Sequence, residues 1–322
     1  MERGCRTLTC LSLALVALAW PIWQRALATD AASASSHAAP PSSTEPITPI
    51  PEPPPADPRR LALGARLFSD RSLSRDGSRS CSSCHHLDTN GADHNPRDHA
   101  LDGSAIPFNT PSVFNAALSF RLNWEGNFRT LEAQTAFTLQ SRSTMGASVD
   151  AVVEKLRADK AAVSEFRRAY GHGPDAASLL DAIATFERSL LTPRSRFDRW
   201  LTGDREALSV RELEGYRLFK SLGCVSCHQG VNIGGNLFER HGIFRPPGRA
   251  EPALLRVPSL RNVATTAPYF HDGSEATLEG AIRKMASAQL DLSLSDEQVE
   301  RLAEFLRTLT GEYRGRPVAS DR

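Results

Sequence analysis

The chain has 322 residues, which is long enough for two ordinary domains. Hydrophobic residues make up 40% of it and charged residues 23%, and both fractions are typical of globular proteins. The formal net charge of +1 gives no indication of nucleic acid or of an anionic membrane surface as a partner.

The first 28 residues have the features of an export signal. Arg3 and Arg6 supply positive charge, an apolar run covers residues 11–20, and residues 26–28 offer a small-x-small cleavage site. We therefore expect a cleaved signal peptide over residues 1–28 and a periplasmic location. An uncleaved membrane anchor is the alternative, although the run is shorter than the roughly 20 residues that a spanning helix needs.

Residues 29–58 are rich in Ala, Ser and Pro. A segment of this composition buries little apolar surface, and its prolines favour an extended chain. The sequence therefore predicts a disordered linker between the signal and the folded part.

Beyond the linker, the spacing of apolar residues is mostly helical. Helices are predicted over residues 59–68, 111–118, 151–170 (as two helices), 179–191 and 211–222. Ser295 followed by Gln298 forms a capping-box start for a last helix, which Gly311 ends. The sequence shows no long alternating strand pattern, so the expected fold class is mainly α.

Cysteine usage gives the strongest signal for chemistry. Two copies of a Cys-x-x-Cys-His motif comprise Cys81, Cys84, His85, Cys224, Cys227 and His228. In this motif the two thiols become thioethers to a porphyrin, and the adjacent His binds the iron of the resulting haem c. A redox dithiol needs no following His, and a zinc site would want another ligand pair. The remaining Cys5 and Cys10 lie in the predicted signal, so we expect two covalently bound haems c.

The two halves of the chain repeat one another. Leu-Gly-Ala-Arg-Leu-Phe at residues 63–68 precedes the first motif, and Glu-Gly-Tyr-Arg-Leu-Phe at residues 214–219 precedes the second. A proline-bearing segment follows each motif, at residues 109–115 and 256–262. We interpret this as a tandem duplication that gives two cytochrome c-like helical haem domains, over residues 59–200 and 201–322.

With these motifs the chain resembles the bacterial di-haem cytochrome c peroxidases, a family that also includes MauG. The resemblance covers residues 59–311, with further matches at residues 67–70, 109–116, 196–198, 267–273, 285–290 and 305–311. It implies that electrons from a periplasmic small cytochrome c or copper protein enter at the second haem. Hydrogen peroxide would then be reduced to water at the first haem. The resemblance also implies a homodimer.

The resemblance assigns roles to individual residues. His85 would be the proximal ligand at the reaction site, and His228 the proximal ligand at the electron-entry site. Met285 matches the methionine that binds the second iron, where MauG has a tyrosine, and such a thioether ligand raises the potential. Trp124 matches the tryptophan between the two haems. The family's calcium site between the domains matches Asn109, Thr266 and Pro268, whose oxygen atoms suit calcium.

The distal side of the first haem departs from the family pattern. The family has a Gln and, ten residues later, a Glu that moves a proton between the peroxide oxygens. Gln134 matches the Gln, but the Glu position falls on Thr144, whose hydroxyl is no base near neutral pH. In the loop after the first motif, His99 is the expected sixth ligand of the first iron, and His94 or no histidine are the alternatives.

Three functions are consistent with these residues. The leading hypothesis is a cytochrome c peroxidase with an altered distal pocket. The second is a MauG-like oxidation of a partner protein, and the third is a non-enzymatic electron carrier or redox sensor. Met285 favours the first over the second, whereas Thr144 favours the third over the first.

Overall fold

A computed structural model describes residues 45–240, 242–245 and 254–319, which belong to the unit Ala38–Arg322. The predicted signal peptide and residues 29–44 of the predicted linker lie outside the described residues. Within the described part, no helix combines the length and apolar character needed to cross a membrane.

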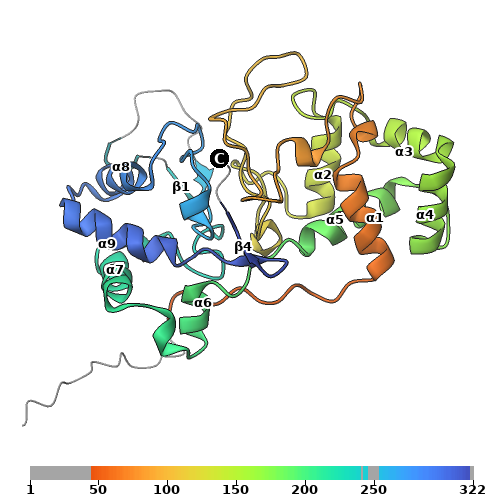
Figure 1. The fold of residues 1–322 in the computed structure, drawn as a ribbon. Coiled ribbons are helices and arrows are strands. Elements are labelled where there is room, and N and C mark those ends of the chain that lie inside the picture. Colours follow the sequence, from red (N-terminus) through yellow and green to blue (C-terminus); the bar gives the residue numbers. More distant parts are fainter. Residues whose placement is uncertain (1–44, 241, 246–253, 320–322) are drawn as a thin grey trace, which may run out of the picture. The chain divides into compact units, whose positions relative to one another are not determined.

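The described chain is mainly helical, as expected (Figure 1). The helices are α1 (Pro58–Phe68), α2 (Leu131–Gln140), α3 (Val149–Ala158), α4 (Lys160–Tyr170), α5 (Ala176–Arg188), α6 (Arg196–Leu201), α7 (Val210–Ser221), α8 (Leu278–Leu290) and α9 (Asp296–Arg307). The strands of the described residues are β1 (Phe238–Glu239), which pairs antiparallel with β2 (Leu255–Arg256), and β3 (Glu312–Tyr313), which pairs antiparallel with β4 (Arg316–Pro317).

Some elements differ from the sequence-based expectations. The helix predicted over residues 111–118 is extended chain that ends in one 3₁₀ turn, Ala116–Leu118, because Asn115 takes a left-handed φ of 62°. The sequence patterns do not predict α2, α6 or α8. In α2 the reason is clear: its apolar residues do not gather on one face, so no helical stripe appears.

The end of the predicted linker packs on the C-terminal half. Ile47 and Ile50 are buried, and Ile47 shares a core with Tyr216 of α7. Glu45 accepts hydrogen bonds from the Tyr216 hydroxyl and the Lys220 ammonium group. The expectation of a disordered linker is therefore wrong for residues 45–50, because Ile47 finds apolar partners far along the chain and Ile50 N donates to Asp198.

Each half is built on a crossing of two helices, α1 with α5 and α7 with α9 (Figure 1). At each crossing a glycine lets two backbones touch. A Cβ atom on Gly64 would lie 2.0 Å from the carbonyl oxygen of Ala182, and one on Gly215 would lie 2.0 Å from that of Arg301. A side chain at either position would therefore force the two crossing helices apart.

The aromatic packing beside the two crossings is repeated as well. The ring centroids of Phe68 and Phe186 lie 5.3 Å apart in the first half, and those of Phe219 and Phe305 lie 5.2 Å apart in the second. Each pair joins the two helices of its crossing, α1 to α5 and α7 to α9. The predicted tandem arrangement of two cytochrome c-like helical domains is confirmed.

The two ends of the described chain pack on opposite halves. Residues 45–50 contact the C-terminal half, whereas the β3–β4 hairpin after α9 returns to the N-terminal half. There the Tyr313 ring lies 4.9 Å from the Phe114 ring, and Val318 is buried beside Phe68.

Helix α6 belongs to the core of the C-terminal half. Phe197 and Trp200 are buried there against Tyr216 and, for Phe197, against Phe305. We therefore propose a domain boundary just before α6, near residue 195, a few residues earlier than the position expected from the sequence.

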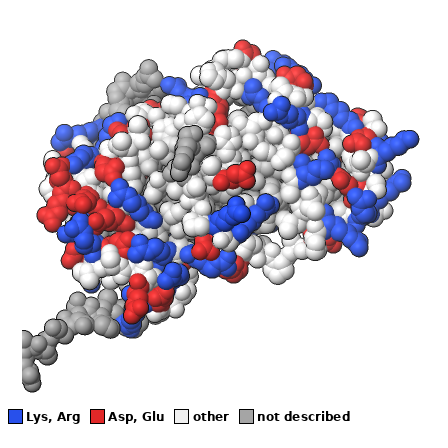
Figure 2. Space-filling view, in the orientation of Figure 1, with Lys and Arg blue, Asp and Glu red and all other residues white. Residues whose placement is uncertain are grey.

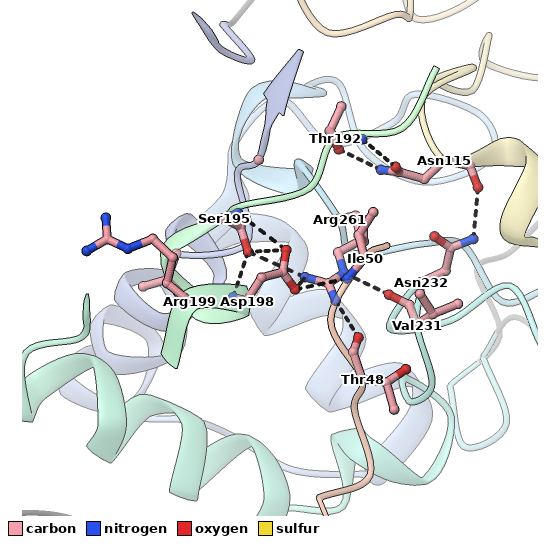
Figure 3. A network of polar contacts seen from close by, with 12 residues as sticks. Thr48, Ile50, Asn115, Thr192, Ser195, Asp198, Arg199, Val231, Asn232 and Arg261 are labelled. Atoms are coloured by element: carbon pink, nitrogen blue, oxygen red, sulfur yellow. Dashed lines mark hydrogen bonds and ion pairs between the residues drawn. The ribbon is translucent and has the colours of Figure 1, made fainter. Parts of the chain in front are cut away.

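A buried ion pair ties these parts of the C-terminal half together (Figure 3). Nη1 of Arg261 lies 2.7 Å from Oδ1 of Asp198 in α6, with side-chain exposures of 1% and 4%. Arg261 also donates to the carbonyl oxygens of Thr48, which lies before α1, and of Val231, which follows the second motif. Because Ser195 donates to the other Asp198 oxygen, both charged groups are well supplied with partners, as a buried pair requires.

Surface charge is mixed on the face drawn in Figure 2, where Lys and Arg alternate with Asp and Glu and uncharged residues occupy much of the middle. This distribution agrees with the net charge of +1.

We expect Gly215→Ala to lower the free energy of unfolding by about 1–3 kcal/mol, because the new methyl group pushes α7 away from α9. Denaturant titration of the haem-loaded protein measures this change. Gly173→Ala is the matched control, since nothing lies within 4 Å of a Cβ atom at Gly173. Equal stability of the two variants would contradict the backbone contact.

Candidate functional site

Both Cys-x-x-Cys-His motifs line one cavity of about 650 Å³. Every residue predicted for the site lies on its wall: Cys81, Cys84, His85, His99, Asn109, Trp124, Gln134, Thr144, Cys224, Cys227, His228, Thr266, Pro268 and Met285. The alternative ligand His94 is exposed and is not part of this wall. The cavity thus brings together residues that are spread over some two hundred positions of the sequence.

The first motif presents a histidine whose ring is already oriented. A 3₁₀ turn, Cys81–Ser83, carries the chain to His85, and Nδ1 of His85 lies 3.1 Å from the carbonyl oxygen of Gly91. With the proton on Nδ1 donated to that oxygen, Nε2 keeps its lone pair for a metal. Gly91 has a φ of +71°, and a Cβ atom there would lie 2.9 Å from the Phe114 ring.

The second motif repeats this arrangement. A 3₁₀ turn, Cys224–Ser226, leads to His228, whose Nδ1 lies 3.2 Å from the carbonyl oxygen of Ile233. Burial lowers the pKa of His228 to about 4, and burial also lowers the pKa of His85. Both rings are therefore neutral at pH 7, which is the form that binds iron.

The thiols of the motifs are not activated. Burial raises the pKa of Cys81 and of Cys84 to about 12, and that of Cys224 to about 11. A redox dithiol has at least one cysteine with a lowered pKa. Among the described residues, the cluster able to hold a metal is Cys84 with Asp93 and Asp98, which leaves Cys81 aside. The redox and zinc alternatives therefore fit these cysteines less well than haem attachment.

Two crossed backbone hydrogen bonds join the halves at the cavity. Asn109 N donates to the carbonyl oxygen of His271 at 2.7 Å, and Arg256 N donates to that of Trp124 at 2.8 Å. The Trp124 indole N–H donates in turn to the Asn109 carbonyl oxygen at 2.9 Å. These bonds hold the Trp124 ring at the boundary between the halves, on the wall that both motifs share.

The internal repeat places His271 in the second half where Trp124 stands in the first. Asn115 and Asn262 are equivalent positions with φ values of 62° and 61°, and Trp124 and His271 follow each of them by nine residues. The two rings meet across the boundary, with centroids 6.2 Å apart and planes inclined by 77°. His271 is buried and lines the cavity.

Arg256 is a buried cation on the cavity wall. Its Nε donates to the Asn123 carbonyl oxygen, and no carboxylate among the described residues pairs with it. Burial lowers the pKa of Arg256 to about 10, because no neighbouring anion offsets the loss of water. An anionic group in the cavity would supply the missing charge, and the propionates of a haem are such groups. The residues present therefore fit a haem.

The candidate calcium ligands Asn109, Thr266 and Pro268 line the same cavity. Asn109 contacts the segment of Thr266 and Pro268 through its bond to His271, and the Asn109 side-chain amide donates to the Asn95 carbonyl oxygen. The Thr266 hydroxyl donates within its own turn. Calcium binding at these residues stays a prediction.

On the distal side, α2 carries Gln134 into the cavity wall. The Gln134 amide donates to the Thr138 hydroxyl at 3.0 Å. The Thr144 hydroxyl donates to the Thr138 carbonyl oxygen at 2.5 Å, so its proton is held by the backbone of α2. Thr144 thus offers neither a carboxylate nor a free hydroxyl proton.

Sequence reasoning missed Glu187. This residue of α5 is 9% exposed, lines the cavity, and has an Oε2 atom without a hydrogen-bond partner. Burial raises its pKa to about 8. An amphipathic pattern treats a Glu at a helix end as solvent-facing, so the one available signal was its place directly after the buried Phe186.

Comparisons with known proteins agree with this geometry. A family model described as di-haem cytochrome c peroxidase matches residues 58–206, and a cytochrome c model matches residues 213–310. The cytochrome c551 peroxidase of Nitrosomonas europaea is 37% identical, over 84% of this chain and 86% of that protein. The methylamine utilization protein MauG of Methylorubrum extorquens is 32% identical, over 82% of each chain. A solved MauG-like protein associated with microbial copper homeostasis has a TM-score of 0.73 at 28% identity, over 82% of this chain and 94% of that one.

The burial of Glu187 predicts a specific pH dependence of stability. Its pKa is about 8 in the folded protein against an ordinary value of 4.5, so the folded state holds a proton that the unfolded state releases between these values. The free energy of unfolding therefore falls as the pH rises through this window, by about 1.4 kcal/mol for each pKa unit. Glu187→Gln removes this fall. Denaturant titrations near pH 5 and near pH 8 test it, and identical pH dependence in both proteins would contradict it.

Proposed function

The chain belongs to the di-haem cytochrome c peroxidase family, and on this premise we propose that it reduces hydrogen peroxide to water with electrons from a small redox protein. The observation that carries the proposal is the single cavity walled by two haem-attachment motifs, with Trp124 between them. An enzyme of this kind needs one half that accepts electrons and one half that binds peroxide, and the two halves differ in this respect.

The second half has the residues of an electron-entry site. His228 offers a neutral imidazole, and Met285 of α8 lines the same cavity with a thioether. Two covalently held haems supply the redox-active iron, and a His and Met ligand pair favours its reduced form. Trp124 offers an aromatic ring between the two sites. We assign the peroxide site to the first half, where Gln134 provides an amide and His85 the proximal imidazole.

The two alternatives each have one observation in their favour. Oxidation of a partner protein is supported by the similarity to MauG and to the solved MauG-like protein, whereas Met285 stands against it. A non-catalytic electron carrier is supported by Thr144, whose hydroxyl is bound to the backbone of α2. Turnover measurements separate these functions.

We further propose a calcium ion held by Asn109, Thr266 and Pro268, with the two halves contributing one side each. Calcium in this position would reinforce the contact that Asn109 makes with His271. We also propose a periplasmic location, a homodimeric state, and a small cytochrome c or copper protein as the electron donor. His99 is proposed as the sixth ligand of the first iron. His99 is favoured over His94 because it lines the cavity.

Steady-state oxidation of a reduced small cytochrome c by hydrogen peroxide tests the function. The enzyme is haem-loaded, supplied with calcium and pre-reduced at its high-potential haem, and Thr144→Glu is measured beside it. We expect rapid turnover of the unchanged protein, because the cavity joins an electron-entry half to a peroxide half.

The outcomes of this test are distinct. Negligible turnover that Thr144→Glu restores would overturn the peroxidase function and leave electron transfer or protein oxidation. Oxidation of a co-purified protein by peroxide without consumption of the donor cytochrome would favour the MauG-like alternative.

The assignment of Met285 gives a separate prediction. Met285→His replaces a thioether by a more basic nitrogen ligand, so we expect the midpoint potential of one haem to fall by on the order of 0.1 V, within the range of about 0.8 V that axial ligands set. Spectroscopic redox titration measures both haems. A Met285→His protein in which neither potential changes would show that Met285 is a packing residue.

A further inference from the structure

Glu187 neighbours both the first haem motif and helix α2. On one side it acts on Cys81. Burial is the main cause that raises the pKa of this thiol, and the charge of Glu187 is the second. On the other side it neighbours Thr135 of α2, the residue next to Gln134. Glu187 therefore belongs to the part of the cavity where the proposed peroxide site is formed.

The Glu187 carboxyl is poorly satisfied by the protein. Its Oε2 atom and the Thr135 hydroxyl are both buried, and neither makes a hydrogen bond of good geometry. A buried carboxyl oxygen without a partner is rare and carries a cost in stability. The Thr135 hydroxyl is near enough to lower the pKa of Glu187, and because the Glu187 side chain also lines the cavity, its carboxyl can in addition reach a group in the cavity.

No other carboxyl on the described cavity wall has this combination of features. Asp98 already accepts a hydrogen bond from the Thr110 hydroxyl. Glu125 is exposed to solvent, and Glu239 lies beside the second motif, where it acts on Cys227.

We propose that Glu187 is the catalytic carboxyl that transfers protons in the first-haem pocket, in place of the glutamate that relatives are expected to carry at the position of Thr144. This inference rests on the peroxidase function proposed above and deepens it. Reduction of one hydrogen peroxide takes two electrons, which come from the donor protein, and two protons, and it yields two waters. As the O–O bond breaks, Glu187 gives its proton to the leaving oxygen and then recovers one from solvent.

The charge state of Glu187 suits this role. Burial raises its pKa to about 8, so the group is protonated and able to donate at neutral pH. Glu132 of α2 adds to the rise, whereas Thr135 of α2 and Arg188 of its own helix oppose it. Cys81, the group of the first motif on which Glu187 acts, becomes a thioether once the haem is attached and then carries no charge.

The test compares three variants of the haem-loaded chain: Glu187→Gln, Asp98→Asn, and Glu154→Gln as the control, since Glu154 is exposed on α3. Removal of a positioned acid lowers turnover by about 10²-fold or more. We expect this loss in Glu187→Gln, together with loss of the alkaline limb near pH 8 in the turnover profile. Glu154→Gln should match the unchanged protein. Haem content and unfolding curves show that each variant is folded.

A second readout does not depend on turnover. Carbon monoxide bound to the reduced protein, and released by light, is a probe of the pocket in infrared difference spectra. We expect a shift in the carbonyl band of a protonated carboxyl in the unchanged protein, and its loss in Glu187→Gln but not in Glu154→Gln. The band should also fade as the pH rises through about 8.

The two readouts separate the two proposals. Peroxide turnover that persists in Glu187→Gln, or a loss that follows Asp98→Asn instead, would overturn the role of Glu187 while the peroxidase function stands. Absence of turnover in the unchanged protein, with the carboxyl band still coupled to carbon monoxide, would overturn the peroxidase function but keep Glu187 at the ligand side. Absence of the band overturns the placement of Glu187.

Discussion

The site depends on the crossed pair of backbone hydrogen bonds between the halves, from Asn109 to His271 and from Arg256 to Trp124. Each bond links the proline-bearing segment of one half to the turn of the other, so neither half can slide without breaking a buried bond. Such a loss costs the full desolvation of the freed groups. These main-chain contacts therefore set how far apart the two motifs lie. They also position the Trp124 ring and the candidate calcium ligands.

Main-chain groups also hold the two histidines of the motifs. In each half a carbonyl oxygen lies beside Nδ1 of the imidazole, that of Gly91 for His85 and that of Ile233 for His228. The residue before each carbonyl is held in turn, because the Ser112 hydroxyl donates to Asn90 and the Ser259 hydroxyl donates to Asn232. The duplication has kept this support while the cavity walls diverged. The first half has a carboxyl at Glu187, directly after Phe186. The equivalent position of the second half, directly after Phe305, is Leu306.

Sequence predicted the parts of this structure that are encoded locally. The haem motifs are readable because two thiols and an imidazole must reach one macrocycle, which requires short spacing, and α1, α5, α7 and α9 are readable because each buries one face. The family motifs placed Trp124 and Met285 on the cavity wall. Local patterns failed where distant contacts decide. Helix α2 lacks an apolar stripe, and Glu45 and Ile47 of the predicted linker are held by contacts with α7.

Glu187 shows the same limit at the level of chemistry. Its charge marks it as a surface residue in any pattern based on the helix alone, and its burial follows from α2 and the first motif closing over the end of α5. A buried carboxyl is visible only once these three elements are assembled, because the cost of removing it from water is a property of its surroundings.

The exchange of chain ends between the halves has a consequence for biogenesis. Residues 45–57 are made before α1, yet their isoleucines are covered by α7 and its neighbours, which are made some 160 residues later. The β3–β4 hairpin and Val318 complete a core whose other members, residues 68–190, are made earlier. Contacts between such distant segments form slowly, and a nascent first half leaves its own core open until then. Because Tyr313 and Val318 share this cluster with Cys81, the first haem-attachment motif is covered only once these late-made residues are in place.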